Sequence, residues 1–202
     1  GNASADQNSP WSASGGNPTL TPYIADVADI SFEKYFANRK GYISLAAFYK
    51  HLESYVYNHD QIFDFTGYPT GGVTPVINFG KSSAPDNGEG GWIKGLELSI
   101  SAPFDIFHPA LEGFGAQFSA STTDSEVQPD PTQPATALPG LSENVINGSL
   151  YYERYGFQSR VSARYRSDYL GEVDGFGNGR TLRSVAAETV VDAQIGYEFQ
   201  SG

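Results

Sequence analysis

The sequence predicts an all-β fold in which antiparallel strands follow one another as hairpins. Apolar and polar residues alternate with a period of two in seven segments, whereas few segments keep the spacing of an amphipathic helix. Glycine accounts for 23 of the 202 residues and recurs throughout the chain. Short and long connections alternate along the chain between the seven segments. Together these observations favour a meander of strands with two chemically different faces.

The seven predicted strands are residues 23–36, 42–57, 92–102, 114–123, 144–154, 157–169 and 187–199. On one face of each strand apolar residues recur at every second position, although Phe48 blurs the polar face of the second strand. The apolar faces are, strand by strand, Ala28, Ile30, Phe32 and Phe36; Ile43, Leu45, Ala47 and Tyr49; Leu96, Leu98, Ile100 and Ala102; Ala116, Phe118 and Ala120; Ile146, Leu150 and Tyr152; Val161, Ala163, Tyr165 and Tyr169; and Val191, Ala193, Ile195, Tyr197 and Phe199.

The clearest hairpin is predicted at Tyr155 and Gly156. A two-residue turn there places Tyr151 opposite Arg160 and Asn147 opposite Arg164, all on the polar face. The same register pairs Leu150 with Val161 on the apolar face. A shift by one residue would mix the two faces, so the polarity pattern fixes this register.

The lengths of the connections point to a transmembrane β-barrel. Short links at 37–41, 103–113 and 155–156 alternate with long links at about 58–91, 124–143 and 170–186. Barrels in outer membranes have short turns at one end, long loops at the other, and aromatic girdles at both interfaces. Aromatic residues flank each short link: Tyr35, Phe36, Tyr42, Phe104, Phe107, Phe114, Tyr155 and Phe157. A soluble β-sandwich that binds carbohydrate is the alternative, since two packed sheets also alternate.

Composition excludes several functions. The chain has 12 basic and 23 acidic side chains and a net charge of −11, so phosphate backbones would repel it and we expect no nucleic-acid binding. The lack of cysteine rules out disulfide scaffolds, zinc fingers and thiolate catalysis. The histidines His51, His59 and His108 have neither metal-ligand spacing nor a nucleophile motif beside them. We therefore predict no enzyme activity, no catalytic residue, no metal and no cofactor.

Segments in a fixed order along residues 16–199 carry a resemblance to a known family. They read GNPTLTP at 16–22, ISFEKYF at 30–36, ISLAAFYK at 43–50, GLELS at 95–99, LPGLS at 138–142, YYERYGF at 151–157 and YRSDY at 165–169. In this order they resemble the C-terminal part of the barrel of a TonB-dependent outer-membrane receptor. Within that family the sequence is most similar to the branch associated with carbohydrate scavenging in Gram-negative bacteria.

The resemblance implies a barrel of about 22 strands with a plugged lumen, and about seven strands cannot close one. The expectation is therefore a fragment of an antiparallel transmembrane β-barrel. Residues 1–22 would form an extracellular loop and 23–199 the strands, and the plug domain and the remaining strands would lie outside 1–202. An outer-membrane barrel without a plug, with a structural or adhesive role, is a further alternative.

The resemblance also implies energised uptake of a scarce nutrient across the outer membrane of a Gram-negative bacterium. The nutrient is expected to be an oligosaccharide, with a ferric siderophore as the alternative. The implied partners are the TonB–ExbB–ExbD complex, reached through the plug, the nutrient itself, and outer-membrane lipid and lipopolysaccharide.

Two groups of residues are candidate sites. The first lies in and beside the longest loop, where aromatic rings can stack on sugars and polar groups can bind hydroxyls: Tyr55, Tyr57, His59, Asp60, Asp64, Tyr68 and Trp92. The plain alternative is an aromatic girdle beside a solvated acidic loop. The second group faces the predicted lumen: Arg160, Arg164, Arg166, Glu188 and Asp192. It reads either as a cross-strand charge ladder or as a docking site for carboxylates of the plug.

Overall fold

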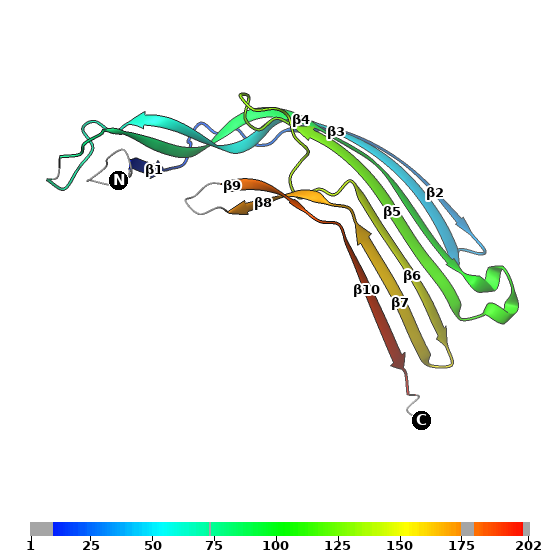
Figure 1. Ribbon diagram of the computed structural model, residues 1–202. Helices are drawn as coiled ribbons and strands as arrows, with labels where there is room; N and C mark the ends of the chain where they lie inside the picture. The colour runs from blue at the N-terminus through cyan, green and yellow to red at the C-terminus, as the bar shows by residue number, and fades with distance from the viewer. Residues whose placement is uncertain (1–9, 73, 175–179, 200–202) are drawn as a thin grey trace. The chain divides into compact units, whose positions relative to one another are not determined.

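The computed structural model describes residues 10–72, 74–174 and 180–199 (Figure 1). Within these ranges no helix has the length and apolarity needed to span a membrane. The elements, in chain order, are β1 (Trp11–Ser14), β2 (Ala25–Phe36), β3 (Gly41–Asp64), β4 (Phe79–Pro103), the 3₁₀ helices η1 (Phe104–Ile106) and η2 (Pro109–Leu111), β5 (Phe114–Val127), β6 (Asn144–Arg154), β7 (Phe157–Arg166), β8 (Tyr169–Asp174), β9 (Arg180–Val185) and β10 (Glu188–Tyr197).

The main sheet has the strand order β10-β7-β6-β5-β4-β3-β2, so neighbours in the sheet are nearly all neighbours in sequence (Figure 1). The pairs β5–β6, β6–β7 and β7–β10 are antiparallel. Each of the seven predicted ranges overlaps one of these strands, β6 has the predicted bounds, and β3, β4 and β5 extend beyond the predicted ones. The predicted all-β antiparallel fold is confirmed.

The predicted register at the Tyr155–Gly156 turn is also confirmed. Tyr151 pairs with Arg160, Asn147 with Arg164, and Leu150 with Val161. Both turn residues have positive φ, 56° for Tyr155 and 78° for Gly156, as a two-residue type I′ turn requires. This turn twists in the same sense as the strands, which is why it holds them in register.

Three segments expected to be loops contain strands. The loop predicted at 58–91 is largely a continuation of β3 to Asp64 and of β4 from Phe79. The loop predicted at 170–186 contains the separate hairpin β8–β9, and the region expected to be a loop at 1–22 contains β1, which pairs with β4 in parallel. A strand needs about 9–11 residues to cross a bilayer. β3 has 24 residues and β4 has 25, so both are much longer than a bilayer crossing requires.

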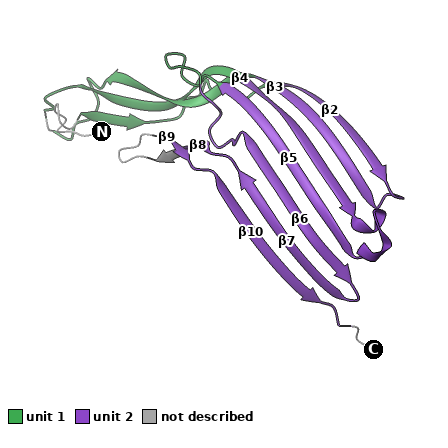
Figure 2. Cartoon of the chain, turned by 45° about the vertical axis from the view of Figure 1, so that its right-hand side comes forward, with its two compact units in different colours: residues 1–25, 52–91, 127–135 green, residues 26–51, 92–126, 136–202 purple. Residues whose placement is uncertain are grey.

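The chain divides into two compact units, shown in Figure 2. Unit 1 consists of residues 1–25, 52–91 and 127–135, and unit 2 of residues 26–51, 92–126 and 136–202. In the described part of unit 1, Trp11 and Phe65 are buried and stacked, with ring centroids 5.4 Å apart, and the Trp11 indole donates a hydrogen bond to the Ile77 carbonyl. This small core joins β1 to the far end of the β3–β4 hairpin.

The sheet of unit 2 has no apolar core, because its apolar face is uncovered. Ile30 is 73% exposed, Val191 65% and Ile195 77%. Among the described residues of the chain only Trp11, Phe65 and Val127 are buried hydrophobic side chains. Exposing so much apolar surface to water would be strongly unfavourable, whereas lipid covers it without cost. The sheet is therefore built as the wall of a membrane barrel, apolar outside and polar inside.

Ion pairs connect successive short links of unit 2. Lys40 Nζ, in the first link, lies 2.7 Å from Asp105 Oδ2 in η1 of the second link. This hydrogen-bonded carboxylate raises the pKa of Lys40 above its usual value. Arg154 Nη2, beside the third link, lies 2.7 Å from Glu112 Oε2 in the second. Both pairs are partly exposed, so each contributes little alone, but together they align three turns.

Replacing Gly156 with alanine should weaken the β6–β7 hairpin. Its φ of 78° disfavours any side chain, and the new Cβ would lie 2.8 Å from the Glu198 carbonyl. We expect the intact protein to lose roughly 1–2 kcal/mol of stability. The measurement is the temperature at which the folded barrel band disappears on an unboiled gel. Gly196→Ala is the matched control, since nothing lies within 4 Å of its Cβ; equal midpoints for both variants would contradict the prediction.

Candidate functional site

Within unit 1 the hairpin β3–β4 brings together two of the predicted loop residues. The rings of Tyr57 and His59 stack with centroids 5.7 Å apart and planes inclined by 25°. His59 Nδ1 lies 3.1 Å from Asp86 Oδ2 on β4. Period-two spacing places Tyr57 and His59 on the same face of β3, whereas Asp86 joins them through cross-strand pairing. Asp86 lies in the same predicted loop, but a loop has no register, so the sequence does not place this carboxylate beside His59.

Asp60 forms an ion pair with Lys81 on β4. Its Oδ2 lies 2.7 Å from Lys81 Nζ, and hydrogen bonds from Lys81 and Ser83 lower the pKa of the Asp60 carboxyl below its usual value. The pKa of Tyr57 is raised, first by burial and then by the negative charges of Asp130 and Asp86. Tyr57 therefore stays neutral at physiological pH and can donate its hydroxyl proton in a hydrogen bond.

Asp64 and Tyr68 serve the structure of the hairpin end. Asp64 Oδ1 accepts hydrogen bonds from the backbone N–H of Thr66 at 2.9 Å and from its hydroxyl at 2.6 Å. The Tyr68 ring contacts Phe63 and Phe65 edge-on. Both residues shape the end of the hairpin beside the Trp11–Phe65 core, and the Tyr68 ring is still half exposed.

The other two predicted aromatic residues lie in different units. Tyr55 belongs to unit 1, where its ring meets Tyr23 edge-on with centroids 5.9 Å apart. Trp92 belongs to unit 2, where the Lys94 ammonium lies 4.3 Å from the centre of its ring. Tyr55, Tyr57 and His59 therefore form an aromatic row along the unit 1 part of β3, of which Trp92 is not a member.

The described part of unit 1 is strongly acidic. Lys81 is its one lysine or arginine, and Asp60 already neutralises it. Such a surface repels anionic solutes and attracts cations. Its carboxylates are Glu53, Asp60, Asp64, Asp86, Glu89 and Asp130.

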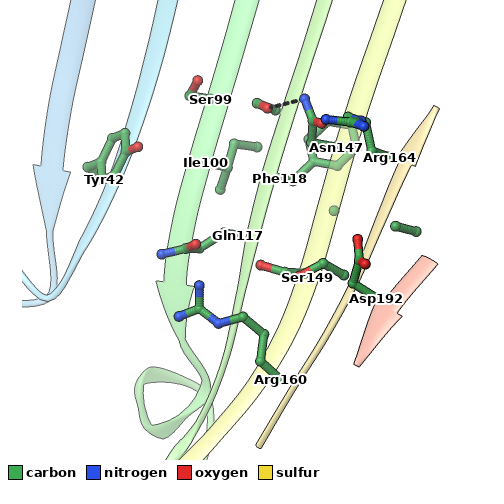
Figure 3. Close-up of a pocket in the computed structure, with 14 residues that line it drawn as sticks. Tyr42, Ser99, Ile100, Gln117, Phe118, Asn147, Ser149, Arg160, Arg164 and Asp192 are labelled. Carbon is green, nitrogen blue, oxygen red and sulfur yellow. Dashed lines mark hydrogen bonds between the residues drawn. The ribbon is translucent and has the colours of Figure 1, made fainter. Parts of the chain in front are cut away.

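In unit 2 the predicted lumen residues share the polar face of the sheet. Arg160, Arg164 and Arg166 are separated by even numbers of residues, so they lie on the same face of β7. The register places Glu188 opposite Arg166. Asp192 lies opposite Ser162, between the positions of Arg160 and Arg164. The face opens on a cavity of about 520 Å³ to which Arg160, Arg164 and Asp192 contribute (Figure 3).

The three arginines have different partners. Arg166 donates from Nε to Ser142 Oγ at 3.0 Å, and its guanidinium lies 3.9 Å from the centre of the Tyr169 ring. Arg160 has one long ion pair, 3.9 Å, with Glu153. Within the described ranges Arg164 has no hydrogen-bond or ion-pair partner, and neither has Asp192. The acidic and basic side chains are thus adjacent without forming a closed ladder.

The described residues contain no group of three histidine, aspartate or glutamate side chains arranged to hold a metal ion. The His59–Asp86 pair is therefore best described as a hydrogen-bonded pair beside an aromatic ring. Such a pair can exchange hydrogen bonds with hydroxyl groups of a solute.

Comparison with known proteins places the fold. A family model described as "TonB dependent receptor-like, beta-barrel" matches residues 1–202. No curated protein sequence matches the chain significantly. Among solved structures, the siderophore receptor PirA from Acinetobacter baumannii aligns with a TM-score of 0.64 at 14% identity, over 93% of this chain and 27% of that receptor. The ferric enterobactin receptor PfeA from Pseudomonas aeruginosa aligns with a TM-score of 0.60 at 9% identity, over 90% and 24%.

The chain thus spans about a quarter of the length of these receptors. Both are siderophore receptors, whereas the sequence resemblance favoured the carbohydrate branch; at these identities the likeness shows the fold alone. The family is one of outer-membrane receptors of Gram-negative bacteria rather than enzymes, as expected. The alternating strands, the uncovered apolar face and the match over the whole chain lead to one conclusion: the chain belongs to the TonB-dependent receptor family and forms part of its β-barrel.

Proposed function

We propose that the receptor containing this chain takes up a scarce nutrient across the outer membrane, with energy supplied through TonB. The observation that carries the proposal is the family match over residues 1–202. In this proposal the TonB–ExbB–ExbD complex acts on a plug domain that this stretch of sequence does not include. The apolar face of unit 2 contacts outer-membrane lipid, and the acidic unit 1 lies outside the cell, near lipopolysaccharide.

The nutrient is, in our proposal, an oligosaccharide. The aromatic row Tyr55–Tyr57–His59 offers ring faces to pyranose C–H groups, and Asp86 and the Tyr57 hydroxyl offer hydrogen bonds. A ferric siderophore is the second candidate, because PirA and PfeA are siderophore receptors with the same fold. The acidic surface of unit 1 argues against it, since it would repel an anionic chelate.

Deleting the gene should abolish energised uptake of at least one neutral oligosaccharide by the parent bacterium. Re-expression should restore it, and a protonophore should stop uptake in both wild-type and complemented cells while leaving surface binding intact. Uptake of radiolabelled sugars by washed cells measures this directly. Unchanged uptake of every oligosaccharide, combined with lost uptake of a ferric siderophore, would establish the second candidate.

Tyr57→Ala should weaken binding of the transported sugar to the full-length receptor. Loss of one stacking ring is expected to lower affinity about 2- to 10-fold, measured by titration calorimetry in detergent. Tyr57→Phe keeps the ring and should lose much less. Tyr35→Ala removes an exposed tyrosine of unit 2 and should bind as the wild type does. Equal affinity for Tyr57→Ala and Tyr35→Ala would remove Tyr57 from the site.

Arg164 is a candidate contact for the plug. Arg164 has spare donors on the polar face of β7, and we propose that it binds a carboxylate of the plug in the resting receptor. Arg164→Ala should then raise leak of small antibiotics into cells at unchanged receptor abundance. Arg166→Ala, which disturbs contacts with Ser142 and Tyr169 instead, should not. An unchanged leak in Arg164→Ala would contradict the proposal.

A further inference from the structure

The cavity on the polar face of unit 2 is lined by side chains that the strand register aligns in rows. Gln117 pairs with Ser149, Ser149 with Ser162, and Ser162 with Asp192, so one row crosses β5, β6, β7 and β10. The next row contains Ser119, Asn147 and Arg164. In Figure 3 Gln117, Ser149, Arg160 and Asp192 surround the open space of this cavity.

Most of the hydrogen-bonding capacity of these rows is unused. The bond that joins their side chains runs from Asn147 Nδ2 to Ser119 Oγ, at 3.2 Å. That bond involves none of Gln117, Ser149, Ser162 and Asp192, whose side chains have no hydrogen-bond partner within the described ranges. The polar face of the sheet therefore presents free donors and free acceptors to whatever passes along it.

The mixture of donors and acceptors identifies the chemistry of the solute. Amides and hydroxyls both donate and accept, an arginine only donates, and an aspartate only accepts. A sugar hydroxyl also does both, so it can use every group of the row. An anion only accepts, so it could bind Arg160 and Arg164, but it would face the carboxylate of Asp192 and leave the acceptors of the row without partners. An apolar solute would leave all of these groups without partners.

We propose that this cavity is a second contact site for the transported solute, and that the solute is neutral and polyhydroxylated, of the saccharide class. The inference rests on the proposed uptake function and adds a site distinct from the aromatic row of unit 1. A volume of about 520 Å³ falls within the range of roughly 300–1,000 Å³ of small-molecule pockets. A row crossing three strand spacings spans about 14 Å, enough for more than one sugar ring.

The position of the site determines when it acts. In the proposed mechanism the plug fills the lumen at rest, so a solute reaches the barrel wall only after the plug has been drawn aside. The first binding event, at the aromatic row, does not need the cavity. Variants of the cavity are therefore expected to slow transport and to leave surface binding intact.

The test uses the full-length receptor in cells and the double variant Gln117→Ala/Asn147→Ala. The probes are radiolabelled maltotriose, cellotriose and xylotriose, which are neutral, and trigalacturonate, which is anionic. Binding is measured on cells treated with a protonophore, and uptake on energised cells. For the neutral trisaccharide that the wild type transports, uptake should fall about 5- to 100-fold with the loss of two hydrogen-bonding side chains, while binding stays unchanged.

Gln158→Ala is the matched control, because Gln158 lies on the same face of β7 but does not line the cavity. It should transport as the wild type does. The double variant is compared at equal outer-membrane abundance and equal heat-dependent gel shift, and Gln117→Asn, which keeps an amide, should retain most of the uptake.

Three results would overturn the inference. Uptake of the neutral trisaccharide at the wild-type rate by the double variant would remove the cavity from the transport path. A fall confined to trigalacturonate would assign it to anions, and increased antibiotic leak with normal uptake would assign it to plug docking. If deletion of the gene abolishes uptake of a ferric siderophore and of no oligosaccharide, the proposed oligosaccharide uptake is wrong, and the inference falls with it.

Discussion

The backbone hydrogen bonds between neighbouring strands are the constraint on which the rest of this chain depends. Lipid offers no partner to an N–H or C=O group, so the strands of unit 2 satisfy these groups by pairing with one another, on both sides for the strands between β2 and β10. Side chains contribute little to holding the sheet together, because the described residues of its apolar face are largely exposed. Two consequences follow. The two faces are free to specialise, one for lipid and one for solute, and a change of register would exchange them.

The strands of unit 2 could be predicted from sequence because two different surroundings impose a strict alternation. At the Tyr155–Gly156 hairpin the polarity pattern even fixed the pairing partners. The outer parts of β3 and β4 could not be predicted in this way, since both sides of that hairpin are solvated and residues 80–90 are rich in turn-forming glycine. β1 could not be predicted because its four residues pair with a segment 69 positions further along the chain.

In the candidate sites, too, residues close in sequence could be grouped in advance, whereas contacts between distant segments could not. Tyr57 and His59 are two residues apart, so the sequence grouped them in one candidate site, although the predicted strand ended at Tyr57 and β3 continues to Asp64. Asp86 reaches His59, and Lys81 reaches Asp60, across a hairpin of unpredicted register. Arg166 contacts Ser142, which lies just before β6, and Tyr169, with which β8 begins, and no periodicity points to either contact. Sequence patterns therefore identified the faces, while the pairing of side chains required the structure.

The parallel pairing of β1 with β4 affects the order in which unit 1 can assemble. The β3–β4 hairpin closes through contacts between residues that are near in sequence, whereas Trp11 must return across a long stretch of chain to reach Phe65 and Ile77. Closing so long a loop is slow and entropically costly. The Trp11–Phe65 core is thus a late step of folding, and the hairpin that carries the aromatic row forms before the strand that stabilises its far end.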